Sequence, residues 1–194
     1  LGDKLYLQKA LANAHFLENN LFEKDGRLWR NYINGKRSVP AFLDDYAFLA
    51  KAFIKLYQIT FDKHWLTLSR QLTDYALIHF YDKKSGMFFY SSDEKNELIK
   101  KIDITDNVTP SSNSVMAEVL YDLSTYFDTE DYLDKSSNML SKIFGQMNLK
   151  PVFYTQWCFL AGWYSHGTYE VAIMGKDAFV KNLEMQKKYL TQYP

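Results

Sequence analysis

The sequence has little cysteine, no excess of either charge and no long apolar run. Its single cysteine, Cys158, excludes an intramolecular disulfide and fits a reducing, cytoplasmic compartment. Basic and acidic residues number 23 each, so no net field attracts nucleic acid or an anionic membrane. The longest charge-free run, residues 151–169, contains Gln156 and further polar positions, which makes it too polar for hydrocarbon. We therefore expect a cytoplasmic protein with neither a membrane span nor a nucleic-acid partner.

Motifs of several enzyme classes are also lacking. The four histidines show no ligand spacing such as His-Glu-x-x-His, and Cys158 has no second cysteine to share a metal, so we expect no metal site. No glycine pattern typical of a phosphate loop or a dinucleotide-binding turn occurs, and we expect no cofactor. No nucleophile elbow surrounds a serine, which argues against a serine hydrolase.

What the sequence does contain is a globular composition with many aromatic residues. Hydrophobic residues make up 47% and charged residues 24% of the 194 positions, which excludes disorder and predicts one domain. Aromatic residues reach 17%, which indicates a ring-rich core or a ring-lined cavity.

A short motif recurs three times, with copies that begin at Asp3, Asp62 and Thr129, 59 and 67 residues apart. Each copy starts with a good N-cap residue and has an aromatic residue and a leucine three and four positions later. Ala or Ser follows seven positions after the N-cap residue. Each copy opens a stretch with apolar residues at helical spacing and a polar opposite side, so we expect three surface helices, called outer helices below.

Helices of a second kind follow the outer helices and are apolar on almost every side, namely residues 46–57, 114–127 and 153–164. Lys51 with Lys55 and Glu118 with Asp122, each pair four residues apart, are the charged residues of the first two, and the third has none. Such a helix needs cover almost all round, so we call these the inner helices.

The alternation of outer and inner helices predicts an all-α fold of stacked hairpins. A period near 60 residues indicates a two-layered arc, and a closed arc of six hairpins is an (α/α)6 toroid. This chain supplies about three hairpins, over residues 1–167. We expect a strand at 169–175 followed by a helix at 177–190, so residues 168–194 form a strand-plus-helix appendage.

The connections from outer to inner helices all lie at one end of such an arc. Residues 25–41 and 82–113 each contain a glycine turn and an alternating aromatic stretch, which predicts short β-ribbons. Any pocket belongs at this end, because packed helices occupy the rest of the surface. An open arc also exposes inner-helix faces, so we expect it to pair with the remaining toroid half or with a second copy of itself.

Four stretches resemble one known family. They are LGDxxYL at the start, GRL at 26–28 leading to FLDDYA at 42–47, DNVTPSSNS at 106–114 and EVAIMG at 170–175. In this order they resemble the C-terminal half of the YyaL-like proteins, bacterial relatives of the spermatogenesis-associated thioredoxin-like protein. The resemblance implies a six-hairpin toroid similar to N-acylglucosamine 2-epimerases and six-hairpin glycosidases, together with a thioredoxin-like domain as a partner.

Two carboxylates are the candidates for catalysis. An epimerase or glycosidase needs one carboxylate of tuned pKa and a second from another hairpin, and Asp45 and Asp106 precede different inner helices. Asp44 and Asp45 diverge by about 100° on a helix and cannot face each other as an acid/base pair. One of them is expected to cap the helix, which is also the structural interpretation of both.

Polar residues on the same connections are the candidates for ligand binding, namely Arg30, Tyr32, Asp44, Ser111 and Asn113. They offer a cation, a ring and hydrogen-bonding groups to a small saccharide. The other interpretation of Ser111 and Asn113 is a helix entry around Pro110.

The sequence leaves two functions open. The toroid binds or acts on a carbohydrate, or it is a non-catalytic scaffold for an attached redox domain or a protein partner. The second is favoured by Ala41, Asn107 and Ser112, which stand where the family has glycine, and by the lack of a complete catalytic constellation. The sequence does not decide between an enzyme and a binding module.

Overall fold

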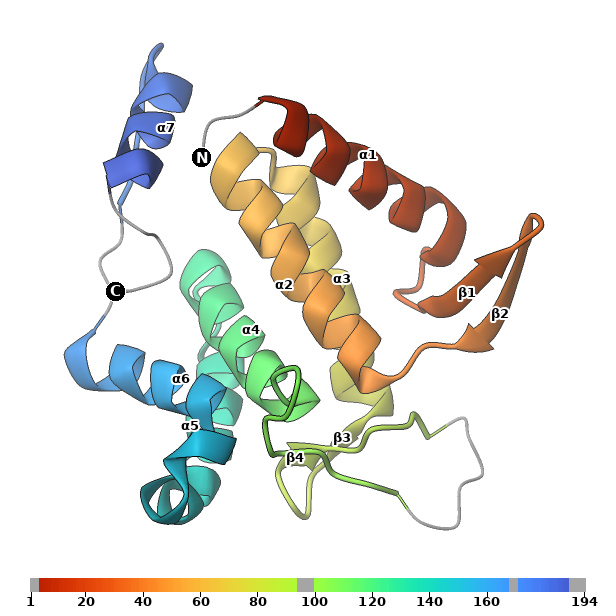
Figure 1. Ribbon diagram of the computed structural model, residues 1–194, viewed down its shortest axis with the longest axis vertical. Helices are drawn as coiled ribbons and strands as arrows, with labels where there is room; N and C mark the ends of the chain where they lie inside the picture. The colour runs from red at the N-terminus through yellow and green to blue at the C-terminus, as the bar shows by residue number, and fades with distance from the viewer. Residues whose placement is uncertain (1–3, 94–99, 168–170, 189–194) are drawn as a thin grey trace.

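The computed structural model describes residues 4–93, 100–167 and 171–188. Figure 1 shows helices packed side by side, with short hairpins at one end. In chain order the elements are α1 (Lys4–Leu21), β1 (Trp29–Ile33), β2 (Lys36–Pro40), α2 (Leu43–Thr60), α3 (Lys63–His79), β3 (Tyr81–Asp82), β4 (Met87–Phe88), α4 (Ser112–Phe127), α5 (Glu130–Leu149), a 3₁₀ turn (Pro151–Phe153), α6 (Thr155–His166) and α7 (Ala178–Lys188).

The helices form the predicted two-layered arc. Inner helices α2, α4 and α6 lie next to one another in sequence order, and outer helices α3 and α5 pack chiefly on α2 and α4. Helices α3 and α5 thus each pack mainly on the inner helix that precedes them in the chain. The predicted all-α class and the alternation of outer and inner helices are confirmed.

Side-chain caps begin two of the helices. Asp62 accepts a hydrogen bond from the His64 backbone N–H (3.0 Å), as the motif predicts, and Ser111 accepts one from Ser114 (3.2 Å). Such a cap stabilises a helix by about 1 kcal/mol. Thr129 stands at the N-cap of α5, but its hydroxyl donates to the Phe127 carbonyl instead. Asp3 lies outside the described residues.

In α3 and α5 the serine of the motif joins the outer helix to the inner helix before it. The Ser69 hydroxyl donates to the Ala50 carbonyl (2.9 Å), and the Ser136 hydroxyl donates to the Ala117 carbonyl (2.7 Å). Both serines are fully buried, and a small side chain at this position lets the two helices approach closely. Because both pairs are offset by 67 positions, Ala50 and Ala117 are equivalent points on successive inner helices.

Cover differs among the inner helices. Helix α4, in the middle of the arc, buries almost its whole first three turns, including Val115, Met116 and Val119. Helices α2 and α6 stand at the ends of the arc, and each keeps an open side, at Phe48 and Phe159 respectively. Within the described residues the expectation of cover almost all round therefore holds for α4 alone, since α4 has inner neighbours on both sides there and α2 and α6 do not.

Both predicted ribbons are present. Strands β1 and β2 pair antiparallel from Trp29 opposite Pro40 to Ile33 opposite Lys36. Their turn is Asn34-Gly35, with φ of 51° and 78°, the left-handed backbone that a tight hairpin turn requires. Strands β3 and β4 pair over two residues each.

The tail differs from the prediction. Of the expected strand at 169–175, residues 171–174 form no strand and residues 168–170 lie outside the described residues. A strand needs a partner edge, and within the described residues none is offered to this segment. Helix α7 packs on the end of α2, where Asn182 and Gln186 donate to the Gln58 carbonyl (2.8 and 3.1 Å). They thereby satisfy a carbonyl that the last turn of α2 leaves without a helical partner.

Among the described helices, none is long and apolar enough to cross a bilayer.

Candidate functional site

The connections that lead into the inner helices meet at one end of the arc. The Leu43 backbone N–H donates to the Tyr90 carbonyl (3.0 Å), which joins the first connection to the second. The Asp106 N–H donates to the Phe153 carbonyl (2.8 Å), which joins the second to the third. Figure 1 shows this end below α2 and α4. The prediction that the varied loops share one end of the molecule is therefore confirmed.

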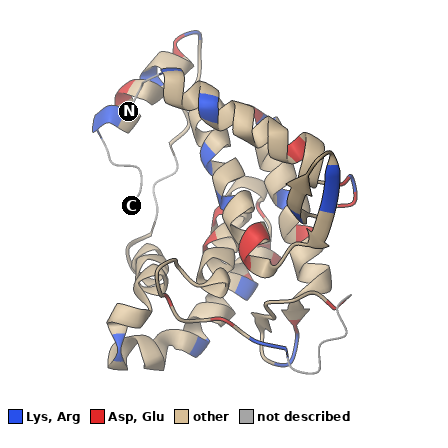
Figure 2. Ribbon diagram, turned by 45° about the vertical axis from the view of Figure 1, so that its right-hand side comes forward, with Lys and Arg blue, Asp and Glu red and all other residues tan. Residues whose placement is uncertain are grey.

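A concavity of about 350 Å³ opens where the end of α1, strand β1 and the start of α2 come together. Figure 2 shows basic residues of the β1–β2 hairpin near acidic residues at the start of α2. The lining residues are Leu17, Leu21, Leu28, Trp29, Arg30, Asp44, Asp45, Phe48, Leu49 and Ala52. The walls are thus mostly apolar, with three charged groups at one end.

Those three charged groups contact one another. Arg30 Nη1 lies 3.2 Å from Asp45 Oδ2 and 3.4 Å from Asp44 Oδ1. The guanidinium also stacks over the Phe42 ring at 5.2 Å. Although adjacent helical side chains diverge, one guanidinium in the ribbon reaches both carboxylates. Asp44, Asp45 and Arg30, all predicted site residues, are therefore brought together.

Tyr90 completes this cluster, and sequence reasoning did not select it. Its hydroxyl donates to Asp44 Oδ2 (3.1 Å), and its ring stacks on Phe42 with centroids 5.0 Å apart. Burial raises the pKa of the Tyr90 hydroxyl, and the charge of Asp44 adds to this, so the hydroxyl is kept as a neutral donor. Its place in the predicted aromatic ribbon was the available signal.

Asp45 has a second task. Its Oδ2 accepts a hydrogen bond from the Phe42 backbone N–H (2.9 Å), which closes the first turn of α2. Asp44 Oδ1 accepts one from the N–H of Asp45 (3.0 Å). Both carboxylates therefore combine a helix-start contact with the ion pair to Arg30. The expected helix-start contact is made by Asp45, and both carboxylates also line the concavity.

Asp106 lies at the same end but serves a different junction. Its Oδ1 accepts from the Ser111 N–H (2.9 Å), and its Oδ2 accepts from the Gln156 N–H (2.8 Å). The carboxylate thus ties the start of α4 to the start of α6, and it is not part of the lining of the concavity. The structure does not place Asp106 beside Asp45 in that concavity.

The remaining candidates are engaged in packing. Ser111 is buried and caps α4. The Asn113 amide, with no exposed surface, donates to the Phe88 and Asp103 carbonyls (3.0 and 2.9 Å) and accepts from the Phe88 N–H (2.8 Å). Tyr32 packs edge-on against Phe16 at 5.7 Å. Across the described ranges, no three His, Cys, Asp or Glu side chains are arranged to hold a metal ion.

Stacked outer–inner hairpins with their loops at a common end are the architecture of an α/α toroid. A solved GH76 α-mannanase from Bacteroides thetaiotaomicron has this fold in common with the chain, with a TM-score of 0.55 at 17% identity. The match covers 74% of this chain and 36% of the mannanase chain.

Sequence comparison identifies the particular family. The chain is 30% identical over 163 residues to spermatogenesis-associated protein 20 of mouse, and equally so to the human protein. An uncharacterised protein of Caenorhabditis elegans is 24% identical over 155 residues. These matches cover 78%, 78% and 76% of this chain and 21% of each relative. No family model matches the sequence.

The chain belongs to the spermatogenesis-associated protein 20 family. It spans about a fifth of the length of these curated relatives.

Proposed function

We propose that this toroid module binds a small saccharide in the concavity between α1, β1 and α2. The observation that carries the proposal is the joint lining by Asp44, Asp45 and Arg30 with the rings of Trp29 and Phe48. Carboxylates and a guanidinium form charge-assisted hydrogen bonds with hydroxyl groups. Aromatic faces cover the apolar C–H surface of a sugar ring, and ligand sites combine apolar walls with a few convergent polar groups in this way.

The class of sugar follows from the solved neighbour. That protein is described as an α-mannanase, so a manno-oligosaccharide is the first ligand to try. The ion pair with Arg30 favours the charged form of Asp44 and Asp45, and a charged carboxylate accepts hydrogen bonds from sugar hydroxyls. We therefore assign Asp44 and Asp45 to binding. A hydrolytic pair of carboxylates flanks the scissile bond from two sides. Asp106, the other candidate, serves the α4–α6 junction instead.

Titration of the chain with manno-oligosaccharides, followed by calorimetry and by amide chemical shifts, tests this proposal. We expect binding in the millimolar range or tighter, with shifts that cluster around Trp29 and Asp44. Asp44→Asn should weaken binding about tenfold, because it removes one charge-assisted hydrogen bond. Asp134→Asn, at an exposed position on α5, is the matched control and should bind as the parent does. Cello-oligosaccharides are the comparison ligands, and weaker binding of them than of manno-oligosaccharides would support the proposed sugar class.

Unchanged affinity in Asp44→Asn would place the ligand elsewhere, and no binding at millimolar concentration would remove the proposal. The second candidate function, a scaffold for a thioredoxin-like domain or another protein, would then remain. It is favoured because the polar atoms of Asp106, Ser111 and Asn113 form hydrogen bonds within the connections and helix starts themselves. Changes in the amide chemical shifts at the loop end on addition of the thioredoxin-like domain, without changes on addition of sugars, support that function.

A further inference from the structure

One residue of the β1–β2 hairpin has a backbone conformation that its side chain disfavours. Val39 in β2 has a φ of 60°, in the left-handed region that β-branched residues rarely adopt. Val39 also precedes Pro40, and a proline favours an extended backbone at the residue before it. A residue in such a conformation is strained, and it persists only where the surrounding structure fixes it.

The other described non-glycine residues with positive φ are Asn34, Phe61 and Asp128, and their conformations have ordinary explanations. Asn34 forms the hairpin turn, which requires a left-handed backbone. Phe61 and Asp128 are the C-caps of α2 and α4, where a left-handed residue commonly ends a helix. Val39 lies inside a strand, so neither a turn nor a helix end accounts for its conformation.

The strand ladder is fixed on both sides of Val39. Ser38, the residue before it, pairs with Asn31, and Pro40, the residue after it, pairs with Trp29. Between these two pairs the described ladder has no pair at the position of Val39 itself. The strained backbone therefore coincides with a local break in an otherwise regular antiparallel ribbon.

Arg30 is the residue of β1 at this break, and its side chain departs from the usual direction. Successive residues of a strand point to opposite faces, yet Trp29 and Arg30 both line the concavity at the loop end. The guanidinium lies 5.2 Å from the centroid of the Phe42 ring and contacts Asp44 and Asp45. The alternation of side chains is thus broken at the same position as the ladder.

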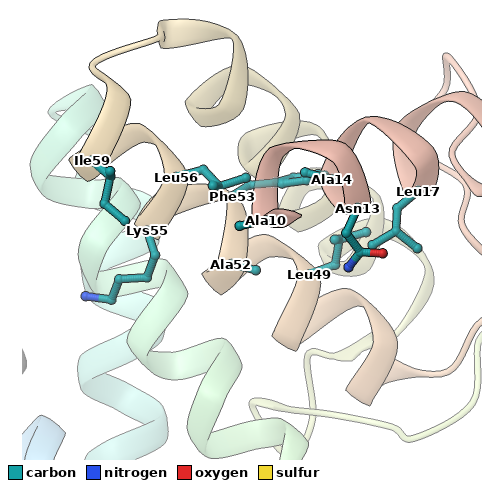
Figure 3. Close-up of a pocket in the computed structure, with 10 residues that line it drawn as sticks. All are labelled: Ala10, Asn13, Ala14, Leu17, Leu49, Ala52, Phe53, Lys55, Leu56 and Ile59. Atoms are coloured by element: carbon teal, nitrogen blue, oxygen red, sulfur yellow. The ribbon is translucent and has the colours of Figure 1, made fainter. Parts of the chain in front are cut away.

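The direction of Arg30 distinguishes the concavity at the loop end from its neighbour. Figure 3 shows this neighbour, a concavity of about 280 Å³ between α1 and α2. Both concavities are lined by Leu17, Leu49 and Ala52, and apolar residues dominate both linings. Among the described residues that line the neighbour there is no carboxylate, and Lys55 is the one cation. The contact of Arg30 with two carboxylates therefore gives the loop-end concavity its distinct polar end.

We propose that Val39 is a positioning residue for this site, because its left-handed backbone bends β2 so that Arg30 in β1 meets Asp44 and Asp45. An extended Val39 would restore the alternation along the ribbon and turn the guanidinium to the face opposite Trp29. Both carboxylates would then lose their cation. The consequence for saccharide binding rests on the function proposed above, whereas the direction of Arg30 does not.

Glycine substitutions at two neighbouring positions test the strain. Val39→Gly permits a positive φ without steric cost, and the Val39 side chain is 41% exposed, so the melting temperature should rise by about 1–4 °C. Ser38→Gly, at an exposed position without positive φ, is the matched control and should lower it by about 1–3 °C. Thermal unfolding of this chain measures both. A Val39→Gly variant no more stable than Ser38→Gly would overturn the proposal.

Val39→Pro tests the direction of Arg30, because proline holds φ near −65°. In the parent chain the ring current of Phe42 should move the signals of the Arg30 side-chain protons upfield, with nuclear Overhauser effects to the ring. Val39→Gly should keep these signals and Val39→Pro should lose them. Signals that persist in a folded Val39→Pro variant would overturn the proposal. If that variant does not fold, the two glycine variants decide.

Titration with manno-oligosaccharides separates this proposal from the function on which its consequence rests. Val39→Pro should weaken binding about as much as Arg30→Gln does, and it should weaken binding no further in a chain that already carries Arg30→Gln. Additive losses would mean that Val39 acts independently of Arg30, against the proposal. Absence of binding in every variant, with the proton signals as expected, would overturn the saccharide function and still support the positioning of Arg30 by Val39.

Discussion

Helices α4 and α6 are both apolar on nearly every side, yet they have different surroundings. Helix α4 lies between α2 and α6 and buries Val115, Met116 and Leu120 completely. Helix α6 has an inner neighbour on one side and fully buries only Trp157 and Leu160 among its described residues, and Phe159 is 38% exposed. An apolar composition states how much cover a helix requires. The position of the helix in the arc decides how much cover it receives.

The largest effect that should separate the two helices comes from truncating a side chain in each. Leu120→Ala in α4 leaves a cavity among buried neighbours and should reduce the free energy of unfolding by about 3 kcal/mol. Phe159→Ala in α6 removes a partly exposed ring and should cost about 1 kcal/mol or less. Urea unfolding of both variants checks this. Equal losses would mean that α6 is as well covered in solution as α4.

A pH effect should distinguish the α2–α4 junction from the rest of the arc. Burial there, with the nearby Glu118 carboxylate, raises the pKa of Asp122 to about 7, against the partial opposition of Lys55 and Lys51. The folded state then holds a proton that the unfolded state has released between about pH 4 and pH 7. The resulting stability is present at low pH and is lost as the pH rises through 7.

The Asp122→Asn variant isolates this contribution. It imitates the protonated side chain, so the difference in unfolding free energy between pH 5 and pH 7.5 should shrink by about 1–3 kcal/mol relative to the parent chain. Denaturant unfolding at both pH values measures it. Asp134→Asn, exposed on α5, is the control and should show the same difference between the two pH values as the parent chain. An unchanged difference in Asp122→Asn would contradict the assignment.

The smallest effect concerns the motif serine. Ser136→Ala removes the hydrogen bond to Ala117 and leaves that carbonyl with one partner fewer, which should cost about 1 kcal/mol. Ser69→Ala should cost a similar amount at Ala50. The reverse change, Ala10→Ser, should leave the stability of the 194-residue chain unaltered, because Ala10 faces no preceding inner helix within the described residues. Thermal unfolding of the three variants compares the repeats directly.

Much of the fold could be predicted because it depends on the spacing of apolar residues over short stretches of sequence. Alternating one-sided and all-round apolar helices predicted the order of layers, and the glycine turn within residues 25–41 predicted the first hairpin. The expected strand at 169–175 was wrong in its described part, because alternation describes a strand's side chains and says nothing about a partner edge. The open side of α2 was equally invisible, since Phe48 and Val115 look alike until their neighbours are known.

The candidate site was predicted less well, because it depends on contacts between connections. Arg30, Asp44 and Asp45 were selected by residue type and position, and they do meet. Tyr90 joins them only because its loop docks on Phe42, more than 40 positions away in the sequence. Asp106 and Asn113 were selected by the same reasoning, but the unsatisfied backbone groups of nearby helix starts and strands take up their polar atoms.

The offset of 67 positions has a consequence for how such an arc is ordered. Lys51 and Glu118 occupy equivalent places on α2 and α4, and they pair across the junction at 2.5 Å. Two copies of the same hairpin set side by side would instead bring lysine against lysine or glutamate against glutamate. Opposite charges at equivalent places therefore favour contact between these two unlike hairpins over contact between two copies of one of them.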